Sequence, residues 1–407
     1  MTAVVVSATN VVGFPEGGGH FWVFMQYVQG LRSIGCDVWW LEEVHEAASG
    51  DVDPGLIATF LERLDRFAMR DRAILYRRHA HGAIDFVYGP PDPWATLGRA
   101  DLLLNFDYRI DESFIRASRT SALVDIDPGL LQFWISVGQI VVPEHDHYLT
   151  IGETVGLAGS SIPDVGRPWK HIRPAVFLSD WPVVPSPANA PFTTVSSWWG
   201  GDGEGEWVTD GTPSLLYENN KRVSFLRFVD LPAHTNHPIE LALNLGAGDP
   251  DDEREGIHGA ESDASLSVTD YVDDATDLQN LTRHGWLVRE AREVAGDPVS
   301  YRSYIQGSRG EFSCVKPSCI AFQNAWISDR TICYLASGKP AIVQDTGPSS
   351  YLPSAEGLFR FSTVEEAAEA LDLVQADFAR QSQAARSIAE AFFDARVIAE
   401  LIIDHVG

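Results

Sequence analysis

The sequence predicts an α/β protein made of two domains, each built on a parallel sheet. Helical patterns alternate with short runs rich in Val, Ile and Leu along all 407 residues, an order that favours parallel strands joined by helices. The length and an apolar content of 45% allow two cores of ordinary size. A proline-rich run, PVVPSPANAP, interrupts the alternation as an interdomain linker would. We therefore predict domains over 1–180 and 192–385, a linker over 181–191 and a final helix over 386–407.

The first domain begins with an apolar run, AVVVSA, which predicts a strand over residues 3–8. A glycine loop follows, and the next pattern predicts an amphipathic helix over 20–34 that ends at Gly35. The other elements predicted in this domain are a strand at 37–41, a helix at 54–69, and strands at 102–106, 122–126 and 148–151.

The second domain restarts with the run FTTVSS, which predicts a strand over 192–197. Further strands are predicted at 239–245, 286–288 and 304–305. Residues 246–277 are dense in Asp and Glu and poor in large apolar side chains, a composition that predicts an exposed, mobile insertion. The capping box Thr363-x-x-Glu366 predicts the start of a helical tail.

The net charge of −27 argues against nucleic acid and anionic membranes as partners, because both require a basic protein surface. A phosphate group would have to be held by a few local cations, and the chain has only four lysines. Its four cysteines show no CxxC spacing, which argues against zinc and predicts reduced thiols inside the cell. No run approaches the roughly 20 apolar residues of a membrane span. We therefore expect a cytoplasmic protein without a membrane span.

The most informative segment, YIQGSRGEFSCVKPSCIAFQNAWISDRTICYLASGKPAIVQDTG, covers residues 304–347. Ser328 stands where an N-cap belongs and Gly338 where a helix ends, and Pro340 prevents the helix from continuing. The apolar run at 341–343 predicts a buried parallel strand. The start of such a helix offers free N–H groups and the positive end of a dipole, so it can bind an anion.

This segment, together with GGGHFWVFMQYVQGLRSIGCDVWWL near the start of the chain, resembles the GT-B glycosyltransferases. The resemblance implies two Rossmann-like domains facing across a cleft, with the last helix crossing back to the first domain. It implies a nucleotide-sugar donor, such as a UDP-sugar, on the second domain and a small-molecule acceptor, such as a natural product, on the first. Hexosyl transfer would then occur in the cleft when the domains close, with no cofactor and no obligatory metal.

His20 is the first candidate catalytic residue, because the resemblance places it where inverting members use a histidine to remove the acceptor proton. An imidazole suits that task, since its pKa lies near working pH. A histidine that only donates a hydrogen bond at a helix start is the alternative.

Gly18 and Gly19 precede His20 and would let the donor diphosphate approach the backbone, with a plain turn as the alternative. Glu153, after the strand at 148–151, is a second candidate base.

Donor phosphates require positive groups and free N–H groups. We expect the diphosphate at the helix that begins with Ser328 and Arg330, with Arg309 and Lys221 as further phosphate ligands. Asp329 would repel phosphate, so it either caps this helix or holds a hydroxyl group, and the sequence leaves both roles open.

Sugar hydroxyls need acceptors, and three residues are predicted to supply them: Glu311, Asp345 and Thr346. A surface pair between Arg309 and Glu311 and an ordinary Asp-x-Gly turn are the alternatives. Retaining GT-B enzymes often carry a second glutamate in the helix after the first, where this chain has Cys333. The stereochemical outcome therefore stays open.

Glycosyl transfer from a nucleoside-diphosphate sugar is the function that these residues predict. Two alternatives keep the same fold. A nucleotide-sugar epimerase would need acid and base groups near the sugar but no acceptor. A catalytically silent protein would bind the sugar nucleotide and stop there.

Overall fold

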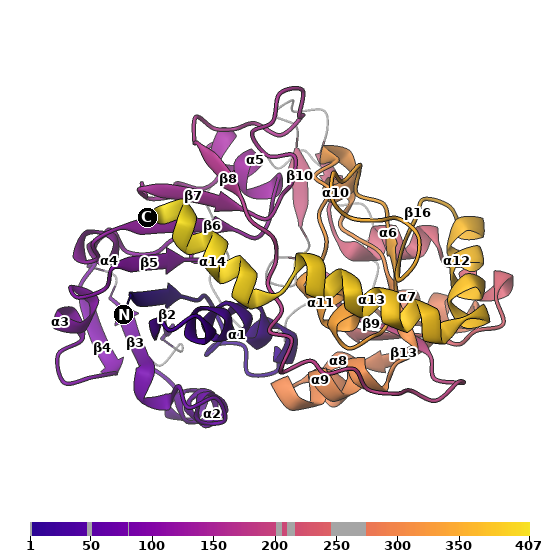
Figure 1. Cartoon of the computed structure of the whole chain (residues 1–407), viewed down its shortest axis with the longest axis horizontal. Helices are drawn as coiled ribbons and strands as arrows, with labels where there is room; N and C mark the ends of the chain where they lie inside the picture. The colour runs from indigo at the N-terminus through magenta and orange to yellow at the C-terminus, as the bar shows by residue number, and fades with distance from the viewer. Residues whose placement is uncertain (1, 47–50, 80, 201–205, 210–215, 246–273) are drawn as a thin grey trace.

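The structure is a computed structural model of the chain, and it describes residues 2–46, 51–79, 81–200, 206–209, 216–245 and 274–407. Figure 1 shows two α/β domains side by side, with the last helices of the chain running across both. Each domain has its own parallel sheet, as the alternation of helical and apolar patterns predicted.

The sheet of the first domain has the order β4-β3-β2-β1-β5-β6-β7-β8, and only β4 runs antiparallel to its neighbour. The apolar strand β1 lies in the middle, with Val4 paired to Val38 on one side and to Leu102 on the other. A strand buried on both faces needs an unbroken apolar run, which explains this sequence. The strands are β1 (Ala3–Ser7), β2 (Asp37–Glu43), β3 (Ala73–Arg78), β4 (Ile84–Tyr88), β5 (Leu102–Asn105), β6 (Ser121–Asp125), β7 (His147–Thr150) and β8 (Trp169–His171). The helices are α1 (Gly18–Ser33), α2 (Pro54–Asp65), η1 (Arg70–Arg72), α3 (Pro93–Leu97), α4 (Glu112–Ala117) and α5 (Leu130–Ser136).

The sheet of the second domain is entirely parallel and has the order β13-β12-β9-β14-β15-β16, which is the doubly wound Rossmann order. Its strands are β9 (Phe192–Ser197), β12 (Ile239–Asn244), β13 (Leu287–Glu290), β14 (Gly310–Ser313), β15 (Ala341–Gln344) and β16 (Leu358–Phe361). A small hairpin joins β10 (Trp207–Thr209) to β11 (Leu216–Glu218). The helices are α6 (Lys221–Arg227), η2 (Leu231–His234), α7 (Asp274–Arg283), α8 (Ala291–Ala295), α9 (Pro298–Gly307), α10 (Pro317–Phe322), α11 (Asp329–Ala336), α12 (Val364–Ala376), α13 (Phe378–Phe392) and α14 (Ala395–Val406).

The end of the chain joins the two domains (Figure 1). Helix α13 packs on α11 of the second domain, whereas α14 packs on α1 of the first. Gly30 of α1 makes that second contact possible, because a Cβ there would lie 2.4 Å from the Ala395 carbonyl oxygen. The Ala395 N–H in turn donates to the Val176 carbonyl at 3.0 Å, which fixes the start of α14 beside the linker.

Most of the predicted elements are present, including the strand at 192–197 and the capping box of Thr363 and Glu366. The strand predicted at 304–305 is wrong, because these residues lie in α9. Asp297 caps that helix by accepting from the Val299 and Ser300 N–H groups, and Pro298 is its first residue.

The acidic insertion predicted at 246–277 falls mainly on residues outside the described part of the chain. Its last four residues are described, and they begin α7. Asp277 is buried there and pairs with the Nε of Arg222 at 2.7 Å. The prediction of an exposed segment is therefore wrong at Asp277, whereas Ala275 and Thr276 are exposed as predicted.

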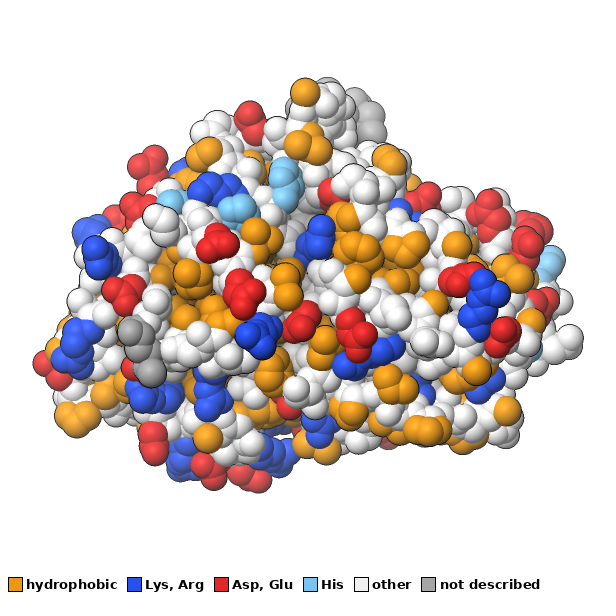
Figure 2. All heavy atoms as spheres, in the orientation of Figure 1, with side chains coloured by type: hydrophobic (Ala, Val, Ile, Leu, Met, Phe, Trp, Pro, Cys, Tyr) orange, Lys and Arg blue, Asp and Glu red, His pale blue; other side chains and the backbone are white. Residues whose placement is uncertain are grey.

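Charged side chains of both signs are interspersed over the described part of the face shown in Figure 2. Within the residues that the structure describes, no helix has the length and apolar character needed to cross a membrane.

Candidate functional site

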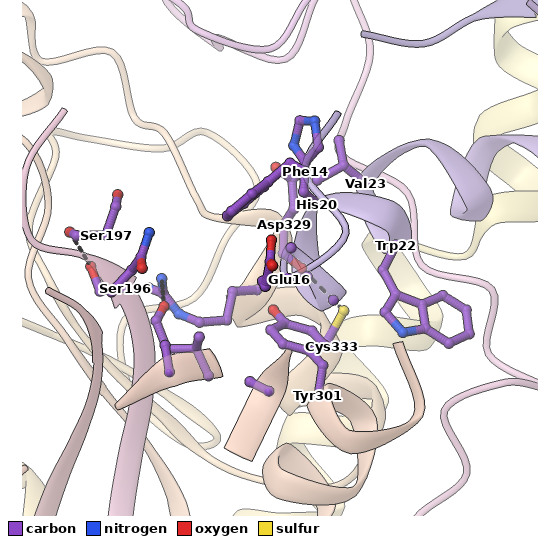
Figure 3. A pocket seen from close by; sticks show the side chains of 18 of the residues that line it. Phe14, Glu16, His20, Trp22, Val23, Ser196, Ser197, Tyr301, Asp329 and Cys333 are labelled. Carbon is purple, nitrogen blue, oxygen red and sulfur yellow. Dashed lines mark hydrogen bonds between the residues drawn. The ribbon is translucent and has the colours of Figure 1, made fainter. Parts of the chain in front are cut away.

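A cavity of about 300 Å³ lies between the two domains. Residues that follow β1 form one wall, and the last residues of β9 and β12 belong to the other. In each sheet the strand order reverses next to β1 or β9, and ligands of open α/β sheets bind at such a point, beyond the carboxyl ends of the strands. The cavity therefore lies where both sheets are suited to bind a ligand. Figure 3 shows side chains from both domains converging on it.

The loop between β1 and α1 is held by a buried carboxyl group. Glu42 accepts from the N–H groups of Val11 at 2.5 Å and Val12 at 2.7 Å, and from Trp40 Nε1 at 2.9 Å. Burial raises the pKa of Glu42 to about 7. This network fixes the backbone that leads into the cavity.

His20 lies in the first turn of α1 and lines the cavity, with its ring beside Phe14 (Figure 3). Its Nε2 lies 2.7 Å from the Thr9 carbonyl oxygen. Because a carbonyl can only accept, Nε2 carries the proton of the neutral ring and Nδ1 keeps a lone pair. Burial lowers the pKa of His20, which favours this neutral form. The ring can thus accept a proton at Nδ1, and its role as a base stays a prediction.

Gly18 and Gly19 line the cavity and also touch the opposite domain. A Cβ on Gly18 would lie 2.4 Å from the backbone oxygens of Ala295 and Asp297, and one on Gly19 would lie 2.7 Å from the Tyr301 ring. The missing side chains therefore let α8 and α9 approach α1. The structure thus gives these glycines a packing role between the domains, in addition to the predicted role beside a diphosphate.

Positive charge gathers on the wall of the second domain. The Arg330 guanidinium is fixed there, with Nε 2.7 Å from Glu311 Oε1 and Nη1 2.8 Å from the Val195 carbonyl oxygen. Burial, and then the charges of Arg330 and Lys316, lower the pKa of Lys221 to about 7. Among the described residues no acceptor is hydrogen-bonded to the Lys221 ammonium, so this group can pair with an anion.

Ser328 is the N-cap of α11, as predicted, and its Oγ accepts from the Arg330 N–H at 3.2 Å. Asp329 is the first residue of the helix and lines the cavity, so the capping role considered for it is taken by Ser328. Burial, and then the charge of Asp127, raise the pKa of Asp329 to about 6. Its other predicted role, holding a hydroxyl group, stays open.

Arg309 and Glu311 do not lie at the cavity. Arg309 precedes β14 at the amino end of the strand, where its Nε donates to Gln375 at 2.7 Å and its guanidinium stacks on Phe378. Glu311 lies within β14, fully buried, and pairs with Arg330. Neither residue can reach a sugar or phosphate in the cavity, so both predictions are wrong. Glu311 instead positions Arg330.

Asp345 and Thr346 also lie outside the cavity. They follow β15, which is separated from β9 by β14. Thr346 donates through Oγ1 to the Trp326 carbonyl at 2.8 Å, and the Asp345 carboxylate accepts from the Gly347 N–H at 3.0 Å. They shape the loops near α11 and do not line the cavity.

Glu153 likewise joins the two domains and does not face the cavity. Its carboxylate accepts from Ser349 Oγ at 2.6 Å and from the Ser350 N–H. A group occupied in this way is poorly placed to act as a base, which contradicts the role predicted for Glu153.

Several polar residues of the cavity were not found from the sequence. Ser196 and Ser197 end β9, Asn244 ends β12, and Glu16 belongs to the glycine loop. The positions of the two serines and the asparagine at carboxyl ends of core strands were the available signal. Tyr301 had no such signal, because residues near it were predicted to form a strand.

Among the described residues no group of three or more His, Cys, Asp or Glu side chains could hold a metal ion. Cys333 lies at the cavity, but burial raises the pKa of its thiol, and its Sγ lies 3.2 Å from the Asp329 carbonyl oxygen. Three described cations line the cavity and can attract an anion: Lys221 of α6, Arg292 of α8 and Arg330 of α11.

Neither a protein-family model nor a curated protein matches this sequence. Solved structures match it along nearly its whole length. The Anabaena protein HepE, in complex with UDP and glucose, is similar with a TM-score of 0.54 at 12% identity, over 99% of both chains. An α-glucosyltransferase in complex with UDP is similar with a TM-score of 0.53 at 9% identity, also over 99% of both chains.

A glycosyltransferase from Rickettsia africae gives a TM-score of 0.50 at 10% identity, over 99% of this chain and 97% of its own. At sequence identities this low, structural similarity establishes the fold alone. This chain has the GT-B fold. It has two parallel-sheet domains, a cavity where the strand order of each sheet reverses, and a last helix that packs on the first domain.

Proposed function

We propose that this protein transfers a sugar from a nucleoside-diphosphate sugar to a small-molecule acceptor. One observation carries the proposal. The interdomain cavity presents Lys221, Arg330 and the start of α11 on one wall, and His20 with an available Nδ1 on the other. A diphosphate fits the first wall, and a hydroxyl group that must lose a proton fits the second. The solved structures of the same fold that contain UDP support this class of donor.

Lys221 is central to the donor site. Its ammonium lies near two other cations and pairs with no described acceptor, an arrangement that is costly in the free protein. A diphosphate between Lys221 and Arg330 would remove that repulsion. As the bond to the sugar breaks, the same two groups would stabilise the negative charge that develops on the leaving phosphate, without an obligatory metal. If so, addition of EDTA leaves the transfer rate unchanged.

The remaining polar groups suit the nucleotide and the sugar. Ser196, Ser197 and Asn244 lie at the strand ends of the second domain and can bind hydroxyl groups of the donor. The Asp329 carboxylate would repel phosphate, so we place it beside the sugar, where it would accept a hydrogen bond from a hydroxyl group. Its pKa of about 6 leaves it mostly ionised at neutral pH.

The acceptor would lie against α1 and its preceding loop. Phe14, Trp22 and Val23 line this side, so a natural product with an apolar surface would fit. The acceptor oxygen forms a bond to the anomeric carbon, and the bond from that carbon to the diphosphate oxygen breaks. The hydroxyl proton passes to His20 Nδ1. Nucleotide sugars made inside the cell would place the reaction in the cytoplasm.

The test begins with titration calorimetry of nucleoside diphosphates and their sugars against the wild-type chain and two variants. We expect Lys221→Met to weaken donor binding about 10-fold to 100-fold, the loss typical of a charged hydrogen bond. Lys170→Met is the matched control, because Lys170 is exposed and its Nζ donates to the His405 carbonyl. It should bind the donor as the wild type does.

Equal binding by wild type and Lys221→Met would overturn the donor site. Incubation with donor alone separates transfer from epimerisation. Donor that is epimerised in the absence of any acceptor would contradict a transferase and favour the epimerase.

A further inference from the structure

A second cavity, of about 680 Å³, opens on the other side of Trp22. Four parts of the chain line it: the last turns of α1, the loop after α2, residues just before the linker and the first residues of α9. Both domains therefore contribute. We call it the hinge-side groove. The residues that carry its charge are Arg32, Arg63, Arg66, Arg302, Asp65 and Asp180.

The hinge-side groove is positive in a strongly acidic chain. Four arginines line it against two aspartates, whereas the chain as a whole carries a net charge of −27. Arg66 forms an ion pair with Glu62 at 3.5 Å. The other three arginines of the groove form no such close pair with a described carboxylate.

Among the described residues, Arg32, Arg63 and Arg302 donate hydrogen bonds to neutral oxygens. Arg32 Nη1 donates to the Phe67 carbonyl at 2.7 Å, Arg63 Nη2 to the Pro15 carbonyl at 2.6 Å, and Arg302 Nη1 to the Asp180 carbonyl at 3.1 Å. Within the described part of the chain no carboxylate lies within 4 Å of their nitrogens.

Each of these bonds uses one of the five N–H groups of a guanidinium. Arg32 makes one further bond, from Nη1 to Gln29 Oε1. Arg63 is 9% exposed, and the carboxylates that act on it, those of Asp297, Glu16 and Glu62, lie beyond 4 Å of its nitrogens. A buried cation without a close partner is better stabilised when an anion binds it directly.

We propose that the hinge-side groove binds a small polyanion that carries phosphate or carboxylate groups and bridges the two domains. Arg32 and Arg63 belong to the first domain and Arg302 to the second, so one ligand would contact both. The planar forks of these side chains suit either oxyanion. Arg302 also lies over the Trp22 ring, 5.7 Å from its centre. Trp22 lines both cavities, so a ligand held by Arg302 would lie close to the side chain that separates them.

This site is separate from the donor site. Arg32 lies twelve residues after His20 in α1, which is roughly 18 Å along the helix axis. Trp22 lines both cavities and is buried between them. A ligand in the hinge-side groove would therefore not reach the reacting atoms, and would instead hold α9 against α1 and α2.

Calorimetric titration with pyrophosphate and, separately, with citrate tests this inference. The whole chain carrying Lys221→Met serves as the parent, because pyrophosphate would otherwise also bind at the proposed donor site. We expect saturable binding of at least one probe, and the stronger of the two identifies phosphate or carboxylate as the preferred group. Adding Arg63→Gln or Arg302→Gln should each weaken it at least tenfold.

Arg119→Gln is the matched control, since it removes one positive charge from a side chain that is 82% exposed and does not line the groove. It should change the affinity less than twofold. Arg302 is only half-buried, so its variant keeps the test valid if Arg63→Gln fails to fold. Absence of saturable binding by both probes would overturn the inference. Equal weakening by Arg119→Gln, or no weakening by Arg302→Gln, would also overturn it.

Discussion

The two walls of the interdomain cavity differ in chemistry. The wall of the second domain carries fixed charge, with Arg330 held by Glu311 and the Val195 carbonyl. The wall of the first domain carries one titratable ring, His20, on a loop that Glu42 holds. The contrast suggests a division of labour, in which the second domain binds the leaving group and the first handles the proton.

Replacing the ring on the first wall is expected to have the largest effect. His20→Ala removes the only group on that wall proposed to accept the proton, so turnover should fall about 100-fold to 10,000-fold. Donor affinity, measured by calorimetry, should change less than threefold, because the cations are on the other wall. A variant that loses donor binding and turnover equally would contradict the division of labour.

Raising the pH should weaken donor binding through the second wall. In the free protein Lys221 loses its proton as the pH rises through about 7, and only the charged form attracts a diphosphate. For a nucleoside diphosphate without its sugar, Asp329 acts in the same direction, because its negative charge appears above about pH 6 and repels phosphate. Donor affinity should therefore fall up to tenfold per pH unit above 7.

Titration calorimetry from pH 6 to 9 measures this slope. Lys221→Met should flatten it above pH 7, leaving the part that Asp329 contributes at lower pH. An unchanged slope in that variant would assign the pH dependence to another group.

The contact between the walls can be tested at Gly18. A Cβ there would meet the backbone of Ala295 and Asp297 at 2.4 Å, and backbone atoms cannot swing aside as a long side chain can. Gly18→Ala should therefore destabilise the protein by about 1–3 kcal/mol in chemical denaturation, although alanine usually favours a helix. Gly307→Ala is the control, because its Cβ would have nothing within 4 Å. Similar stability of the two variants would contradict tight packing at this point.

The same contrast explains how far the sequence could predict the molecule. The Ser328 cap, the Gly338 terminus and the strand after it depend on neighbouring residues, and all three are present. The missed start of α9 also had a local signal, Asp297-Pro298, which was not recognised. Because a strand was predicted at 304–305, Arg309 and Glu311 were expected in the loop after it, where they could bind a ligand. Arg309 instead precedes β14, and Glu311 lies within it.

The remaining site errors have a different cause. Asp345, Thr346 and Glu153 do follow core strands, as predicted. Whether such a residue faces the cavity depends on how far its strand lies from the switch point and on which loop of the other domain covers it. Pairs such as Glu153 with Ser349, almost 200 residues apart in the sequence, are set by the packing of whole domains.

Glu153→Gln is expected to have the smallest effect of these changes. It distinguishes a residue that holds the domains together from a residue that acts in the reaction. As a base it would be essential, and Glu153→Gln would abolish turnover. As the acceptor of two hydrogen bonds from Ser349 and Ser350, it can be replaced by glutamine, whose carbonyl oxygen keeps one of them. We therefore expect a loss of stability below about 1 kcal/mol and turnover within threefold of the wild type, measured by denaturation and by product formation. A loss of turnover as large as that of His20→Ala would return Glu153 to the reaction centre and would mean that the domains rearrange when the substrates bind.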